Sequence, residues 1–167
     1  MTRTKAFVIA IAAAVFLTAA VAVIFMSADD SLKLIVCDAE SQKIYAEFDV
    51  FDGEELSVSY IHSVNITEVF DVYYVNKDSL VCDKQIYSSF GAGMPTEWDD
   101  DWTVSYEDGK MTISGLNMKA PQNGFTYIVG TVYDHILHIG GEDIVLNEIC
   151  GKNARITLKI KTPVFGG

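Results

Sequence analysis

Hydrophobic and polar residues follow two different patterns along this chain of 167 residues. Residues 6–26 contain no charged side chain, whereas beyond residue 31 the apolar residues recur in short alternating runs separated by Gly, Asp and Asn. Alternation with a period of two is typical of half-buried strands, and no later stretch keeps the 3.6-residue period of a long helix. The pattern therefore predicts one apolar helix followed by an all-β domain at residues 32–162.

The runs of the second pattern predict about ten short antiparallel strands, which is typical of a β-sandwich or a partly open barrel. Asp52-Gly53, Asp108-Gly109 and Gly140-Gly141 each lie between two runs. Because glycine adopts positive φ without strain, each pair is predicted to form a tight hairpin turn. The expected strands are residues 32–38, 43–50, 55–64, 69–75, 80–89, 102–106, 110–114, 125–132, 135–139, 143–147 and 155–161.

The N-terminal apolar run is long enough to cross a membrane, since a spanning helix needs about 20 such residues. Arg3 and Lys5 precede the run and two aspartates follow it. The positive-inside rule then places residues 1–5 in the cytoplasm and the β domain outside a cell membrane, as a single-pass protein. A cleaved signal peptide is the alternative, because Ala20-Val21-Ala22 has the small-x-small form of a cleavage site. The run continues past that site to Met26, which favours a retained anchor.

The charges and cysteines exclude several classes of function. All 23 acidic residues but only 10 of the 12 basic ones follow residue 28, which gives that part a net charge of 10 minus 23, or −13. Such a domain repels nucleic acid; we interpret the acidic surface as a solvated one, with attraction of cations or of a basic partner as the alternative. Cys37, Cys82 and Cys150 contain no CxxC pair, so no metal site or cofactor is expected. An exported location permits one disulfide among them.

The densest cluster of reactive side chains is Tyr60-Ile61-His62-Ser63. On a strand, Tyr60 and His62 share one face while Ser63 points to the other, so His62 and Ser63 cannot act together as base and nucleophile. Asp71 is a candidate partner of His62 across a hairpin. By the same period, His135 and His138 lie on opposite faces, and we interpret them as ordinary strand positions.

A second unusual segment follows one of the expected strands, at residues 89–95, and reads Ser-Phe-Gly-Ala-Gly-Met-Pro. Small residues let backbone amides approach an anion or a partner closely. We predict that this segment lies beside His62 and forms a shallow polar pocket with it, rimmed by Tyr60 and Tyr87. The predicted binding residues are Tyr60, His62, Ser63, Asp71, Ser89, Phe90, Gly91 and Gly93.

Three motifs together resemble a known family: Tyr-Ile-His-Ser-Val at residues 60–64, the glycine-rich segment at 89–95, and Asp134-His135 before Gly140-Gly141. The family is domain of unknown function 1850, and the resemblance covers roughly residues 32–160. Asp71 stands where the family is expected to have Glu. The resemblance implies a small exported protein that accompanies TRAP transporters of the TAXI type, with transporter subunits or the solute receptor as partners.

Three functions are consistent with these observations. The first is a non-enzymatic interaction module that assists solute uptake. The second is an extracytoplasmic hydrolase that uses His62 with a distant serine such as Ser89 and with Asp71, although the chain has no G-x-S-x-G motif. The third is a structural protein of the cell envelope.

Overall fold

The computed structural model describes residues 32–64, 66–88 and 99–162. These residues form eleven strands and one short helix, so the all-β prediction is confirmed. The predicted anchor at residues 6–26 and the segment 89–95 lie outside the described residues. Within the described ranges, no helix is long and apolar enough to span a bilayer.

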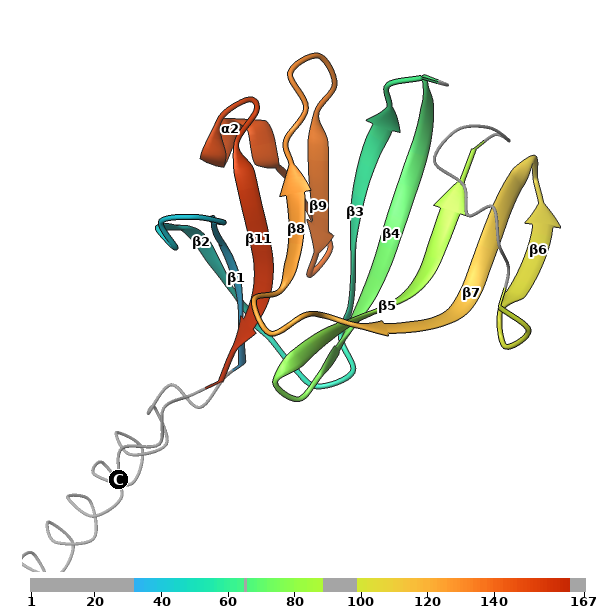
Figure 1. Cartoon of the computed structure of the whole chain (residues 1–167), viewed down its shortest axis with the longest axis horizontal. Helices are drawn as coiled ribbons and strands as arrows, with labels where there is room; N and C mark the ends of the chain where they lie inside the picture. The colour runs from blue at the N-terminus through green and yellow to red at the C-terminus, as the bar shows by residue number, and fades with distance from the viewer. Residues whose placement is uncertain (1–31, 65, 89–98, 163–167) are drawn as a thin grey trace, which may run out of the picture. The chain divides into compact units, whose positions relative to one another are not determined.

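The strands make two open antiparallel sheets (Figure 1). The small sheet has the order β2 (Ile44–Val50), β1 (Leu32–Asp38), β11 (Arg155–Lys161) and β8 (Phe125–Ile128). The large sheet has the order β10 (Glu142–Val145), β9 (His135–Ile139), β3 (Glu55–His62), β4 (Thr67–Asn76), β5 (Ser79–Tyr87), β7 (Lys110–Lys119) and β6 (Thr103–Glu107). Helix α2 (Leu146–Cys150) follows β10 directly.

One hydrophobic core joins the two sheets. Leu34 and Leu158 of the small sheet and Val58 and Ile113 of the large sheet are fully buried in the same cluster. Burying a side chain of this size stabilises a fold by about 1.5–3 kcal/mol. Leu56 and Val58 of β3, which share a face by the period of two, both lie in this core.

Two of the three predicted hairpin turns are present. Asp108 and Gly109, both with positive φ, join β6 to β7, and Gly140 and Gly141 do the same between β9 and β10. The prediction for Asp52-Gly53 is wrong, because this turn connects β2 of the small sheet to β3 of the large sheet. Strands β2 and β3 do not pair with each other, so the chain crosses from one sheet to the other at this turn.

Many strand ends differ from the predictions by one or two residues, as at 55–64, where β3 ends at His62, and larger or structural differences occur in three strands. The strand expected at 125–132 ends at Ile128, and the one expected at 143–147 ends at Val145 and continues as α2. Gly151, with a φ of 87°, ends that helix. The strand expected at 110–114 runs on to Lys119 through Gly115, whose φ is also positive.

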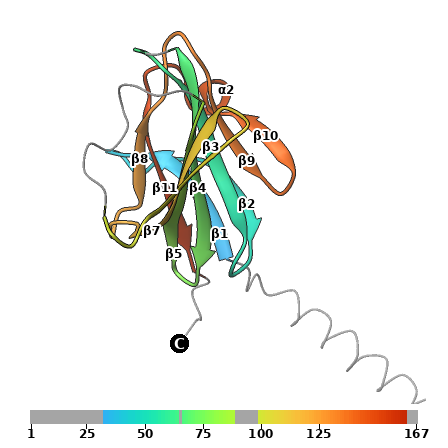
Figure 2. The same ribbon diagram turned by 90° about the vertical axis from the view of Figure 1, so that its right-hand side faces the viewer.

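The strand ends define two poles of the domain. At the upper end in Figure 1, β3 ends, β4 begins and the connection from β8 to β9 turns over. At the lower end, β1 begins and β11 ends. Figure 2 shows the same separation after a turn of 90°. The motif at residues 60–63 therefore lies at the upper end of the domain.

Candidate functional site

A pocket of about 450 Å³ opens at the upper end of the domain. We call it the end pocket, and it is lined by residues 60–63, 128–133, 135 and 153. Strand β3 contributes Tyr60 and His62 from the large sheet, while the residues that follow β8 belong to the small sheet. The pocket thus forms where the two sheets separate, and three of the predicted binding residues, Tyr60, His62 and Ser63, line it.

An aromatic stack forms the inner wall of the end pocket. Tyr60 lies opposite His135 in the register of β3 and β9, and their rings stack with centroids 5.1 Å apart at an angle of 9°. Tyr127 of β8 meets Tyr60 edge to face, at 6.4 Å. Burial raises the pKa of the Tyr60 hydroxyl and lowers the pKa of the His135 imidazole. Both side chains are therefore neutral near pH 7.

His135 also holds the loop over the pocket, residues 130–134. Its Nδ1 atom accepts a hydrogen bond from the Gly130 amide at 3.1 Å, which fixes the neutral ring with its proton on Nε2. Asn147 of α2 donates to the Gly130 carbonyl at 3.1 Å and accepts from the His135 amide at 3.2 Å. A side chain at position 130 would collide with the Tyr133 carbonyl oxygen, so glycine is required for this close approach.

His62 lines the end pocket but lacks the carboxylate partner that the sequence predicted for it. Its Nδ1 atom accepts a weak hydrogen bond from the Val64 amide, at 3.4 Å. Asp71 lies opposite Val58 whereas His62 lies opposite Thr67, a separation of four residues or about 13 Å along the strand. The structure therefore does not bring Asp71 to His62, and the hydrolase interpretation loses that partner.

The glycine-rich segment remains a prediction, because Ser89, Phe90, Gly91 and Gly93 lie outside the described residues. The chain leads toward it through Ser88, whose amide donates to the Glu68 carbonyl at 3.0 Å. Glu68 lies opposite Ile61 of β3.

Asp71 instead lies at the centre of a buried hydrogen-bonded network, which we call the Asp71 cluster. Its carboxylate accepts from Gln85 Nε2 at 2.7 Å and from the Tyr127 hydroxyl at 2.8 Å. The Tyr73 hydroxyl bonds to that of Tyr127, and the Tyr87 hydroxyl donates to Gln85 Oε1 at 3.0 Å. Burial raises the pKa of the Asp71 carboxyl group, although both of its hydrogen bonds oppose that shift.

A serine, a histidine and an aspartate of the large sheet form a series of side-chain contacts. Ser59 Oγ lies 2.8 Å from His138 Nε2, and His138 Nδ1 lies 2.6 Å from Asp143 Oδ1. The order of these contacts is that of a hydrolytic triad. Ser59, however, is only 3% exposed and stands in the middle of a paired strand, so its hydroxyl is not open to an acyl group. We interpret the three residues as a brace between β3, β9 and β10.

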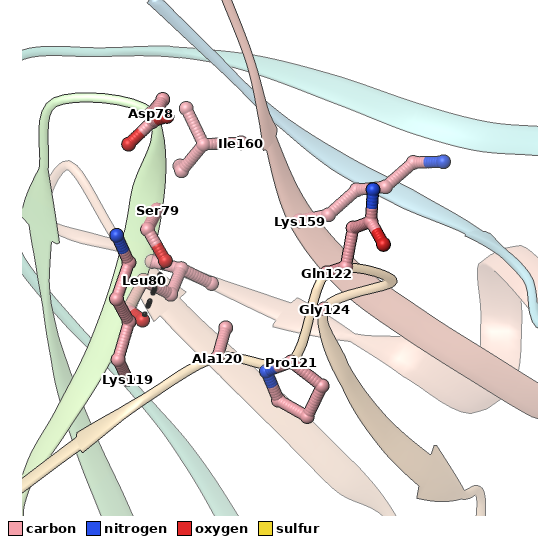
Figure 3. Close-up of a pocket in the computed structure, with 10 residues that line it drawn as sticks. All are labelled: Asp78, Ser79, Leu80, Lys119, Ala120, Pro121, Gln122, Gly124, Lys159 and Ile160. Atoms are coloured by element: carbon pink, nitrogen blue, oxygen red, sulfur yellow. Dashed lines mark hydrogen bonds between the residues drawn. The ribbon is translucent and has the colours of Figure 1, made fainter.

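A cavity of about 220 Å³ lies at the lower end, between the β4–β5 turn, the β7–β8 connection and β11 (Figure 3). Lys119 and Lys159 lie on opposite sides of it. Lys159 bonds to Gln42 at 2.6 Å, and the Ser79 hydroxyl bonds to the Leu80 carbonyl. These polar groups do not converge on one point, so the cavity offers no evident binding chemistry.

In the described part of the chain, no three His, Cys, Asp or Glu side chains gather closely enough to hold a metal.

Comparison with known families identifies the domain. The model described as Domain of unknown function (DUF1850) matches residues 56–146. The chain belongs to this family. The match contains the whole Asp71 cluster and every lining residue of the end pocket except Asn153. No curated protein and no solved structure matches the chain.

Residues that the sequence does not single out also build these sites, among them Tyr73, Gln85, Tyr127, His135 and Asn147. The strand period alone indicates an ordinary strand position for His135, because only the pairing of β9 with β3 sets its ring against Tyr60. The polar side chains of Gln85 and Tyr127 within apolar strands were the available signal.

Proposed function

We propose that this DUF1850 domain is a non-enzymatic binding module that docks through the end pocket onto a component of a solute transporter. The membrane subunit and the solute receptor of a TRAP transporter of the TAXI type are the proposed partners. The observation that carries the proposal is the apolar rim of the end pocket.

Two connections supply that rim. Ile128 and Val132 line the pocket, and Val64 and Ile66 follow its lining residue Ser63 in the β3–β4 turn; their exposed fractions lie between 63% and 75%. Apolar side chains that gather at one end of a domain are typical of interaction sites. Burying them against a partner stabilises the complex by about 25 cal/mol for each Å² removed from water.

The wall behind the rim supplies specificity. Tyr60 and His62 line the pocket, and the Tyr60–His135 stack gives it a rigid aromatic surface. Aromatic residues surrounded by apolar neighbours are the usual anchor points of protein interfaces. A partner loop with one apolar side chain and one hydrogen-bonding group fits this arrangement.

The proposed location is the outer side of a cell membrane, with residues 6–26 as a retained anchor. The apolar run and its flanking charges support this location. Membranes from cells that produce the full chain test it. We expect the protein to remain in the membrane after carbonate washing and the β domain to be digested by protease added from outside. Release into the soluble fraction would show that the segment is cleaved.

Co-purification of the tagged full chain tests the docking function. We expect the wild-type protein to recover a transporter subunit or the solute receptor, and Val132→Asp at the rim to lose it. Phe51→Asp is the matched control, because Phe51 is 67% exposed and lies in the connection that precedes β3, at the other end of that strand. Recovery by the Val132→Asp protein equal to wild type, or failure of the wild type to recover any transporter component, would contradict the proposal.

A further inference from the structure

The hydrogen atoms of the Asp71 cluster all point toward its carboxylate. The Tyr127 hydroxyl donates its one hydrogen to Asp71, so in the contact between Tyr73 and Tyr127 the Tyr73 hydroxyl must be the donor. On the other side, Tyr87 donates to Gln85 and Gln85 donates to Asp71. Gln85 and Tyr127 each contact one of the two carboxyl oxygens, and an ionised carboxylate accepts both of these hydrogen bonds. The network is therefore arranged for a negative charge at Asp71.

No positive charge balances that carboxylate within the described part of the chain. The ion pairs found there join other residues: Lys33 to Asp49, Lys84 to Glu55, His138 to Asp143 and Lys161 to Glu47. Asp71 itself is only 7% exposed. Burying an unpaired charge is costly, which is why buried charges normally have a partner of opposite sign. Among the described residues, the Asp71 carboxylate therefore has neutral hydrogen-bond donors but no ion pair with a basic side chain.

A second cavity lies directly against this carboxylate. We call it the side cavity; its volume is about 190 Å³ and its walls include Asp71, Tyr73, Phe125 and Tyr127. The Tyr73 and Phe125 rings meet at 49° with centroids 4.9 Å apart, so they form a corner. Ring faces attract a cation placed within about 6 Å of the centroid. Aromatic walls beside one carboxylate are the chemistry that recognises organic ammonium groups.

The side cavity is open to solvent. Strand β8 is an edge strand of the small sheet, and Thr126 on β8 and Met118 on β7 are exposed lining residues. The part of the chain after residue 28 has a net charge of −13, which raises the local concentration of cations. A small cation can therefore reach the carboxylate without unfolding the domain.

We propose that the side cavity binds a small organic cation of the alkylammonium class, paired with the Asp71 carboxylate and held against the rings of Tyr73, Phe125 and Tyr127. The bound ammonium group supplies the positive charge that the cluster lacks. The side cavity and the end pocket share no lining residue, so choline titration of the wild type and co-purification test the two proposals independently.

Titration with choline tests the proposal on the full chain in dodecyl maltoside, a detergent without an ammonium group. Ionic strength is held constant with sodium chloride, and the ring resonances of labelled tyrosines are followed. We expect saturable shifts of Tyr73 and Tyr127, assigned from Tyr→Phe variants. The neutral isostere 3,3-dimethyl-1-butanol, which replaces the charged nitrogen by carbon, should produce no saturable shift.

Three variants locate the site. Asp71→Asn removes the charge and should weaken choline binding by about tenfold or more, and Phe125→Leu removes one ring and should weaken it by about threefold. Asp108→Asn removes the same charge from an exposed turn and should bind like the wild type. Absence of a saturable shift in the wild type, equal binding of the neutral isostere, or undiminished binding by a folded Asp71→Asn protein would each overturn the proposal. The comparison of choline with its isostere needs no variant, so it decides the matter even if Asp71→Asn fails to fold.

Discussion

Burial shifts the pKa values of Asp71 and His135 in opposite directions. Both lie close to Tyr127, which bonds to the Asp71 carboxylate and meets the His135 ring edge to face at 6.2 Å. Desolvation disfavours the charged form of each. It therefore raises the pKa of the acid and lowers the pKa of the imidazole, so their effects on stability have opposite dependences on pH.

For Asp71, we expect the free energy of unfolding to fall as the pH rises above about 3.9, the ordinary pKa of an aspartate. Between that value and the raised pKa of the folded state, the folded chain holds more protons than the unfolded chain, so higher pH favours unfolding. Asp71→Asn should flatten this part of the profile, measured by urea unfolding at a series of pH values. The exposed Asp108→Asn is the control. A profile in Asp71→Asn as steep as that of the wild type would contradict the burial of the charge.

For His135, we expect stability to be lost as the pH falls below about 6.5, the ordinary pKa of histidine. Burial lowers the pKa of the His135 imidazole in the folded state, and Nδ1 also accepts the Gly130 amide hydrogen, so acid favours unfolding. His135→Asn offers an acceptor near the same position without titrating. Its unfolding free energy should decrease less than that of the wild type between pH 7 and pH 5. If the unfolding free energy of His135→Asn falls as much as that of the wild type over this pH range, a group other than His135 causes the loss of stability.

At the scale of elements, the β8–β9 loop is the part of the end pocket whose conformation is most constrained. Gly130→Ala should destabilise the protein by about 1–3 kcal/mol, since the added methyl group has no room beside the Tyr133 carbonyl. It should also displace the rim residue Val132 and so weaken co-purification with the transporter component. Thr131→Ala, in the same loop, is the control. A Gly130→Ala protein as stable as wild type, by urea unfolding, would show that the loop is free to shift.

At the scale of the whole molecule, the shared core makes the two sheets one cooperative unit. Leu158 of the small sheet is fully buried against the large sheet, and Leu158→Ala should cost about 2–5 kcal/mol. Unfolding of the variant is followed by tryptophan fluorescence, to which Trp102 beside β6 of the large sheet contributes, and by far-ultraviolet circular dichroism. Both signals should give the same lowered unfolding midpoint. Separate midpoints for the two signals would indicate sheets that unfold independently.

The cysteines also report on the whole fold. All three are free, with Cys37 and Cys82 buried and Cys150 partly exposed, so the disulfide that an exported location permits is not formed. Burial raises the pKa of the Cys82 thiol to about 12, and thiolates are the reactive form. We expect a thiol reagent to modify at most Cys150 in the native chain and all three thiols after unfolding without reductant. Fewer than three thiols in the unfolded chain would reveal a disulfide.

Local pattern determined a large part of this structure. Alternation predicted a strand at 55–64, which the structure has at 55–62, and the shared face of Tyr60 and His62, because side chains on a strand alternate regardless of what the strand pairs with. Asp108-Gly109 and Gly140-Gly141 predicted their hairpins for a similarly local reason, the positive φ that each turn needs. The motifs within residues 56–146 were also sufficient to suggest the family.

Tertiary structure alone decided which chemistry those strands bring together. Tyr127 and Asp71 are 56 residues apart and meet only because β8 of one sheet faces β4 of the other. The Tyr60–His135 stack likewise depends on β9 pairing with β3. The two-residue alternation within a strand does not indicate which strand it pairs with. A shift of one residue in the pairing register would also move every side chain to the other face of the sheet. For that reason the sequence placed Asp71 beside His62, whereas the packing of the two sheets placed it among Gln85, Tyr127 and the side cavity.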